Sequence, residues 1–289
     1  MSLSVVLRSD DNFRRDSFED RVCDDLCEVL LQFLPFEDKF KFECVSKQFQ
    51  RNVFQRQYDL DMFSLKIRDV LGNNIASTLE KLMKKLPNIK SLRLLCLKNM
   101  NKNQMNTVFK NIPELEQMAA INCNPDTNTV INCLRQVSDK WLKIKALNVC
   151  NRMNSLALFM TEVNKLKALE TLQFRLGLKH FEGLQTFEEY FNGLQSLTHL
   201  EISLLCHSTE DHIEKDLLKD IDIYLPKLRV LCLRIDYPIE VSEQTVDSLG
   251  RLSRLESILL KVNNESIRDL IIDKIIKNCK KIKSIDIKV

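Results

Sequence analysis

The chain has 289 residues, of which 44% are hydrophobic and 29% charged, as in ordinary globular proteins. Its 43 basic and 40 acidic side chains leave a formal charge of +3, so the overall charge gives no reason to expect a nucleic-acid partner. The sequence contains no run of 18 apolar residues, which predicts that no helix crosses a membrane. Five Gly and six Pro are too few for an all-β sandwich with many turns.

The ten cysteines predict free thiols rather than a disulfide framework. No two of them are spaced as Cys-x-x-Cys, and the nearest pair is Cys23 and Cys27. The first seven residues carry no basic side chain, unlike the start of a secretory signal. We therefore expect a reducing compartment, the cytoplasm and/or the nucleus.

The first 58 residues divide into a tail and a small helical segment. Residues 1–17 are rich in Asp and predict a disordered tail, and residues 18–58 predict three helices. One apolar stripe at helical spacing marks the first helix, and it consists of Leu26, Val29, Leu30 and Phe33. Pro35 ends that helix, Asp38 is placed to cap the second, and Ser46 opens the third.

This helical segment resembles an F-box, the module that docks receptors onto the adaptor subunit of SCF-type cullin–RING ubiquitin ligases. The matching residues are Asp25-Leu26, Val29-Leu30, Leu34-Pro35, Asp38, Val45-Ser46-Lys47 and Phe49. Where the family usually opens with Leu-Pro, this chain has Val22-Cys23. The resemblance implies binding to the adaptor, and through it to cullin, by residues some of which must instead hold the helices together: Leu26, Leu30, Leu34, Pro35, Phe40, Val45 and Phe49. The alternative is that the segment only caps the front of the next domain.

An internal repeat follows. The phrase L-x-x-L-x-L recurs eight times, and its first apolar residues are Ile89, Leu115, Ile144, Leu169, Leu197, Leu228, Leu255 and Ile282. Successive copies are 26, 29, 25, 28, 31, 27 and 27 residues apart, a period that leaves room for one strand and one helix per unit. Pro87, Pro113 and Pro226 each stand two residues before the phrase and would end the preceding helix. An earlier unit is predicted to begin at Leu60, with Phe63 and Leu65.

The repeat resembles the long leucine-rich repeats of the ribonuclease-inhibitor type. The resemblance implies an α/β solenoid over residues 59–289, with parallel strands on the concave side and helices on the convex side. A loose string of helices with accidental matches is the alternative, and the regular period disfavours it. An F-box followed by leucine-rich repeats is the order found in substrate receptors of ubiquitin ligases, which are not themselves catalytic. The competing interpretation is a plain interaction scaffold.

Alternate strand residues are expected to face the concave side. The predicted contacts to an unidentified substrate protein are Arg93, Asn148, Arg175, His199, Glu201, Arg234 and Lys261. Across the concave positions five side chains are basic, with Lys288 as the fifth, and two, Glu201 and Asp286, are acidic. This excess suggests a partner surface with some negative charge, although an unspecialised solvated face would also expose charges.

No sequence pattern for catalysis, a metal or a cofactor is present. P-loop, G-x-G-x-x-G, H-E-x-x-H and paired-cysteine motifs are missing from the sequence. The best metal candidate, Cys206-His207 with His212, has the spacing of no common site. Cys150 and Cys232 are concave-side cysteines without a base nearby in the sequence. We therefore expect neither an active site nor a bound cofactor.

Overall fold

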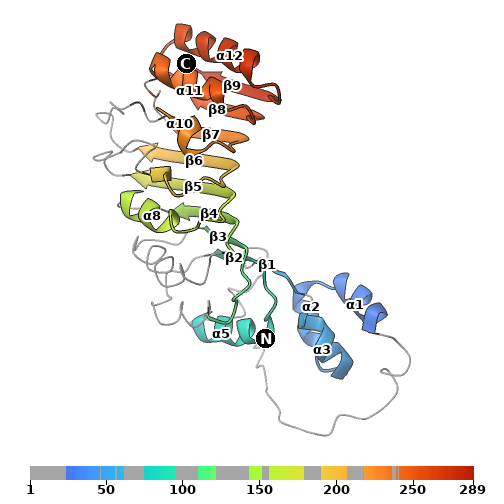
Figure 1. The fold of residues 1–289 in the computed structure, drawn as a ribbon. Coiled ribbons are helices and arrows are strands. Elements are labelled where there is room, and N and C mark those ends of the chain that lie inside the picture. The colour runs from blue at the N-terminus through green and yellow to red at the C-terminus, as the bar shows by residue number, and fades with distance from the viewer. Residues whose placement is uncertain are drawn as a thin grey trace.

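The computed structural model describes residues 24–45, 47–55, 57–61, 75–95, 110–121, 143–151, 156–178, 190–206, 216, 218–235, 239 and 241–289. Within these residues, nine parallel strands form one open sheet in which each strand pairs with the next along the chain (Figure 1). The strands are β1 (Asp59–Asp61), β2 (Ser91–Leu95), β3 (Gln117–Ile121), β4 (Ala146–Asn151), β5 (Thr171–Leu178), β6 (His199–Cys206), β7 (Val230–Ile235), β8 (Ser257–Lys261) and β9 (Ser284–Lys288). The predicted α/β class is confirmed in this form, which is compatible with a solenoid.

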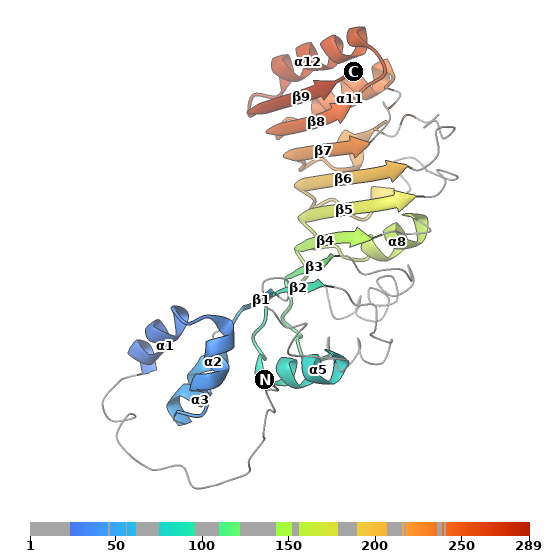
Figure 2. The ribbon, with the colours of Figure 1, turned by 180° about the vertical axis from the view of Figure 1, so that it is seen from behind.

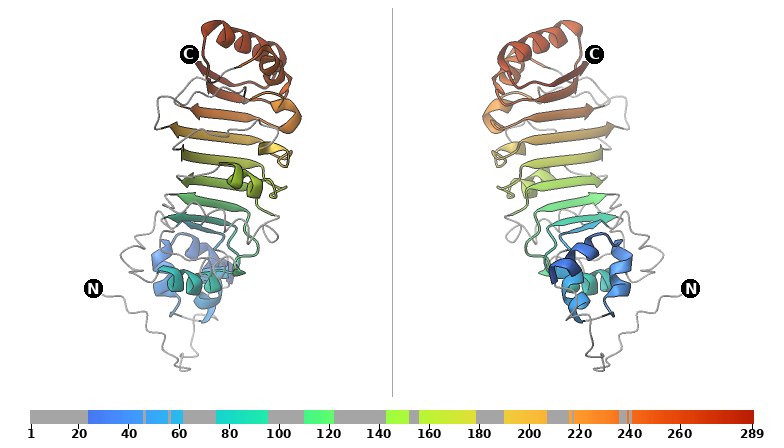
Figure 3. Two further views of the ribbon diagram at one scale, coloured as in Figure 1. Left: turned by 90° about the vertical axis from the view of Figure 1, so that its left-hand side faces the viewer. Right: turned by 90° about the vertical axis from the view of Figure 1, so that its right-hand side faces the viewer.

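Helices precede the sheet and also connect its strands. The first three, before the sheet, are α1 (Asp24–Gln32), α2 (Phe36–Phe42) and α3 (Lys47–Gln55). The connecting helices are α5 (Ile75–Lys85), α8 (Leu156–Val163), α10 (Ile221–Tyr224), α11 (Glu243–Arg251) and α12 (Glu265–Asn278). Helices α8, α10 and α11 lie on the same side of the sheet, so that its other face is open (Figures 2 and 3). In the described part of the chain, no helix combines the length and apolarity needed to span a bilayer.

The strand register matches the repeat spacing read from the sequence. The first residue of each strand pairs with the first residue of the next, from Ser91↔Gln117 to Ser257↔Ser284. The second residues therefore stack as one apolar column: Leu92, Met118, Leu147, Leu172, Leu200, Leu231, Ile258 and Ile285. All but Ile285 are buried, and this column forms much of the core.

A row of backbone hydrogen bonds fixes this register. The carbonyl before β2, that of Lys90, accepts from the Glu116 and Gln117 N–H groups, both at 2.8 Å. The same two-donor arrangement recurs before each strand from β1 to β8, so these backbone groups are paired. Side chains at this position also form ion pairs: Glu256 pairs with Arg229 and Lys283. These cations, Lys283 first, hold the pKa of Glu256 below its ordinary value.

The first unit is phased differently from the prediction. Leu60 pairs with Leu92 and so occupies the second apolar position of its unit, not the first. The first position belongs to Gln57, which is buried and polar, so an apolar template misses it. Its side chain accepts a hydrogen bond from Lys39 Nζ at 2.8 Å and donates one to the Asp59 carbonyl. The other residues predicted for this unit, Phe63 and Leu65, lie outside the described residues.

One local prediction about a helix was wrong. Asp38 does not cap α2, because the helix begins directly after Pro35; its carboxylate pairs with Lys41 within the helix at 2.5 Å. On α12, Ile271 is fully buried and Leu270 is exposed.

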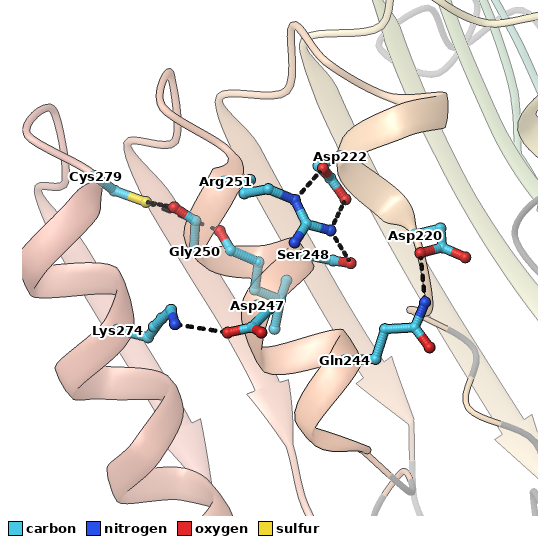
Figure 4. A network of polar contacts seen from close by, with 10 residues as sticks. Asp220, Asp222, Gln244, Asp247, Ser248, Gly250, Arg251, Lys274 and Cys279 are labelled. Atoms are coloured by element: carbon cyan, nitrogen blue, oxygen red, sulfur yellow. Dashed lines mark hydrogen bonds and ion pairs between the residues drawn. The ribbon is translucent and has the colours of Figure 1, made fainter.

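Polar contacts on the helical side tie the last three units together (Figure 4). Arg251 of α11 holds Asp222 of α10 with two hydrogen bonds of 2.6 and 3.0 Å, which raises the pKa of the guanidinium. Lys274 of α12 pairs with Asp247 at 2.6 Å and lowers the pKa of that carboxyl. The Cys279 thiol lies 3.9 Å from the Leu249 carbonyl. These contacts thus fasten α10 to α11, and the α11 segment to α12 and the residue after it, on the helical side of the sheet.

Candidate functional site

Helix α1 has two apolar faces. Its inner face, with Cys27 and Leu31, is buried, and Leu31 is only 4% exposed. The outer face carries the four residues predicted as one apolar stripe: Leu26, Val29, Leu30 and Phe33. Leu30 is 48% and Phe33 80% exposed. The sequence therefore identified the apolar stripe, but the stripe faces away from the other helices; we call these four residues the α1 outer face.

The other residues predicted to contact an adaptor fall into different environments. Pro35 and Val45 are exposed, and Leu34 is half-buried against the core. Phe49 is buried, its ring stacked on that of Phe42 with centroids 6.2 Å apart, so it holds the helices together and is not available to a partner. The side chain of Phe40 lies outside the described part. Of the residues predicted to contact an adaptor, the structure therefore leaves Leu26, Leu30, Pro35 and Val45 exposed.

The three helices are fastened to the first unit of the sheet. Lys85, at the end of α5, donates to both carboxylate oxygens of Glu43 at 2.6 and 2.7 Å and lies 5.5 Å from the centre of the Phe54 ring. Lys39 of α2 reaches Gln57 just before β1, and burial lowers the pKa of Lys39. We call these contacts the joint. They fix where the α1 outer face lies relative to the sheet.

The open face of the sheet consists of the first, third and fifth residue of each strand. At its middle, the third residues form a ladder of hydrogen bonds. Asn148 donates to Gln173 at 2.8 Å, and Gln173 donates to Glu201 at 3.3 Å. Arg234, the fifth residue of β7, donates to the other oxygen of the Glu201 carboxylate. The structure thus brings three of the predicted substrate contacts, Asn148, Glu201 and Arg234, into one network.

The remaining predicted contacts lie apart from this network. Arg93 is near the first strand and pairs with Asp61 at 3.0 Å. His199 shares a hydrogen bond of 2.8 Å between its Nδ1 and the Thr198 hydroxyl. Arg175 is exposed, and among the described residues it makes no ion pair. Lys261 is half-buried on β8. These residues lie on other strands than the central ladder or at other positions along its strands.

The cysteines and histidines offer little for catalysis. Cys232 is buried, and burial, assisted by the charge of Asp286, raises the pKa of its thiol, which disfavours the thiolate that a nucleophile requires. The side chains of Cys150 and Cys206, and all of His207 and His212, are outside the described residues. Within that description, no three His, Cys, Asp or Glu side chains converge as metal ligands would.

Comparison with known proteins adds little. No family model and no curated protein matches the chain. Among solved structures, it is similar to a chain in the crystal structure of the Rad7 and Elc1 complex in yeast. The two are 11% identical, with a TM-score of 0.45, and the similarity covers 91% of this chain and 75% of that chain. A likeness this distant does not bear on function.

Proposed function

We propose that the chain is a non-catalytic substrate receptor of an SCF-type cullin–RING ubiquitin ligase, with an F-box-like module at α1–α3 and leucine-rich repeats after it. The α1 outer face carries this proposal. Large apolar side chains clustered on the outside of a helix mark a surface that a partner covers. Burial of such a face against partner helices is a common mode of docking, and the F-box resemblance identifies the partner as the adaptor.

In this proposal the open face of the sheet holds the substrate. The ladder from Asn148 to Arg234 supplies hydrogen-bond donors and acceptors in fixed positions. The joint connects the helices that carry the α1 outer face to the sheet that carries the ladder. Holding a substrate near a ubiquitin-loaded enzyme raises its effective concentration. Such a receptor acts without catalytic residues or cofactors of its own, and it would work in the cytoplasm or the nucleus.

The test is co-purification with the adaptor subunit after co-expression. Leu30→Glu, on the α1 outer face, places a charge in the docking surface and is expected to abolish capture. Ile276→Glu is the matched control, because Ile276 is also exposed but lies on α12, far along the chain from α1. Failure of the unaltered chain to retain the adaptor would refute the ligase function.

One observation favours a second candidate, a scaffold in which α1–α3 only cap the sheet. The joint, with Lys85 bound to Glu43, shows that the helices contact the first unit as a cap would. A cap predicts that the adaptor is not retained and that substitutions at the α1 outer face change nothing. The co-purification experiment therefore separates the two candidates.

A further inference from the structure

Three equivalent turns carry exposed cations at one edge of the sheet. Lys227, Arg254 and Lys281 each stand three residues before the first residue of β7, β8 and β9, and those first residues are in register. Because the strands are parallel, the turns that lead into them follow one another along the same edge. All three side chains are exposed, as is that of Lys280 beside Lys281. We call these four residues the basic edge.

The backbone fixes each of the three turns. In each, the N–H of the residue after the cation donates to the carbonyl three residues earlier, at 3.1, 2.9 and 3.1 Å in chain order. The residues that flank the cations in these bonds are buried: Leu225, Leu228, Leu252, Leu255 and Cys279. The cations are therefore held at fixed positions along the edge.

The fold does not require a cation in this turn. The same hydrogen bond closes the turns before β5 and β6, at 3.0 and 2.9 Å, and there the equivalent residues are Ala168 and Ser196. Cations also stabilise helix ends, but among the described contacts of the basic edge only Lys280 donates to a helix carbonyl, that of Lys277 at 2.9 Å. Neither the turns nor the helix ends therefore account for the basic edge.

Acids at this edge do not balance the cations. In the described part of the chain, no side chain of the basic edge takes part in an ion pair. Glu256, in the turn before β8, is held by both Arg229 and Lys283. Two cations share this one carboxylate, so it leaves no negative charge for the basic edge.

The acids of the adjoining helices are engaged or lie further back. Asp222 and Asp247 already form ion pairs with cations of α11 and α12. Asp220 and Asp273 form no ion pair with described residues, but each lies at least one helical turn before the end of its helix. Lys277 stands four residues after Asp273, within reach of it on the helix, and so is not part of the basic edge. The overall charge of +3 thus conceals a local excess of positive charge.

The surroundings of the basic edge fit a phosphate backbone. The three turns contain no aromatic residue, so unpaired bases have nothing to stack on. The exposed apolar side chains of these units, Ile223 and Ile276, lie on helices and not in the turns, whereas a protein interface has an apolar core and amphipathic helices insert apolar side chains into lipid. Lys and Arg alone hold phosphates, and such contacts carry no sequence information.

We infer that the basic edge binds the phosphate backbone of a nucleic-acid duplex, independently of base sequence. Neighbouring strands are about 4.8 Å apart, so the three turn cations extend over about 10 Å, close to the rise of three nucleotides in one strand of a duplex. This inference goes beyond the proposed function and does not depend on it. None of the four residues belongs to the α1 outer face, the joint or the ladder.

The experiment measures binding of the full chain to a fluorescein-labelled DNA duplex of about 20 base pairs by fluorescence anisotropy, over a range of salt concentrations. Four phosphate contacts predict that the logarithm of the association constant falls with the logarithm of the salt concentration at a slope of about −3.6. One strand of the duplex, a Glu-rich peptide and vesicles containing phosphatidylserine are the comparison probes. The duplex is expected to bind tightest. Absence of duplex binding, or tighter binding of any comparison probe, overturns the inference.

Substitutions place the site. Lys227→Ala, Arg254→Ala and Lys281→Ala together are expected to reduce the slope to about −1 and to weaken binding by about tenfold or more at about 0.1 M salt. Arg254→Ala alone is expected to reduce the slope by about one, which keeps the test valid if the triple variant is unstable. An unchanged slope in these variants overturns the inference.

Lys143→Ala is the matched control. Lys143 also stands three residues before its strand, β4, and is exposed, but it is paired with Glu114 and lies outside the basic edge. Its substitution is expected to leave the affinity for the duplex within about twofold. Losses in the control equal to those in the triple variant overturn the inference.

The adaptor experiment gives a separate result. Leu30→Glu is expected to lose the adaptor and still bind the duplex, whereas the triple variant is expected to keep the adaptor. Retention of the adaptor by a chain that does not bind the duplex would overturn only the nucleic-acid inference. Duplex binding without any adaptor would overturn only the ligase function.

Discussion

Adjacent leucines on α1 provide a direct test of which face is inside. Leu31 is 4% exposed and Leu30 48% exposed, so the two side chains differ mainly in burial. Leu31→Ala removes buried methyl groups and leaves a cavity, at a cost of about 2–5 kcal/mol. Leu30 has about half its surface covered, so Leu30→Ala is expected to cost about 1 kcal/mol. The more deeply buried leucine should therefore dominate the stability of the helix.

Hydrogen–deuterium exchange of the peptide covering Asp24–Gln32 measures this difference. Three short helices bury little apolar surface on their own, so the larger loss is expected to exceed the free energy that keeps α1 folded. In Leu31→Ala the α1 amides would then exchange nearly as fast as in an unfolded peptide. In Leu30→Ala exchange is expected to accelerate by no more than about tenfold. Peptides from α12 provide the internal reference, since that helix lies at the other end of the sheet.

Equal acceleration in the two variants, or a greater effect of Leu30→Ala, would show that the buried and exposed faces of α1 have been assigned wrongly. Adaptor binding through this helix would then lose its basis, because it requires the outer face to be free. A change in the α12 peptides would instead indicate that the substitution disturbs the whole chain.

Three further predictions concern the sheet and its cysteines. In Gly193→Ala the new Cβ would clash with the Asn164 backbone carbonyl of the preceding unit, so thermal denaturation should show a loss of about 1–3 kcal/mol. The lowered pKa of Glu256 means that this carboxylate stabilises the fold at pH values above 4.5, its ordinary pKa, and that the stabilisation is lost as pH falls through the lowered value. Melting temperatures of the unaltered chain and Glu256→Gln should therefore differ near pH 7 and converge in acid. In alkylation followed by mass spectrometry, exposed Cys44 should react fully, whereas Cys279, buried and with its pKa raised by that burial, should resist.

The repeat could be predicted because spacing carries more information than any single phrase. Each strand buries its second residue, so the apolar column from Leu92 to Ile285 follows from the period once the units are aligned. The prolines indicated the same phase from a separate constraint, since α5 and α10 end two residues before Pro87 and Pro226. Because the apolar period and the prolines indicate the same phase, the register of the strands could be predicted from the sequence.

The first unit was misread for a physical reason, and the burial of α1 could not be read from its pattern. Gln57 occupies a position that is apolar in the later units, and its amide forms hydrogen bonds with Lys39 and the Asp59 carbonyl. A search for apolar residues at fixed spacing does not find such a polar residue. In α1 both exposed Leu30 and buried Leu31 are apolar, so periodicity marks a helix but not which side the protein buries. Pairing of Glu201 with Arg234 joins residues 33 apart and depends on a register that a single unit does not contain.

The two faces of α1 also decide how the capping contacts bear on function. A cap requires only the contacts with the first unit, where Lys85 holds Glu43, whereas Cys27 and Leu31 of α1 are buried within the module, on its α3 side. None of these contacts uses the α1 outer face, so closing the front of the sheet leaves that face available. Capping is therefore compatible with the ligase function and does not explain why four large apolar side chains remain outside. A partner such as the adaptor would account for them, so retention of the adaptor discriminates between the candidate functions, and the contacts of the joint do not.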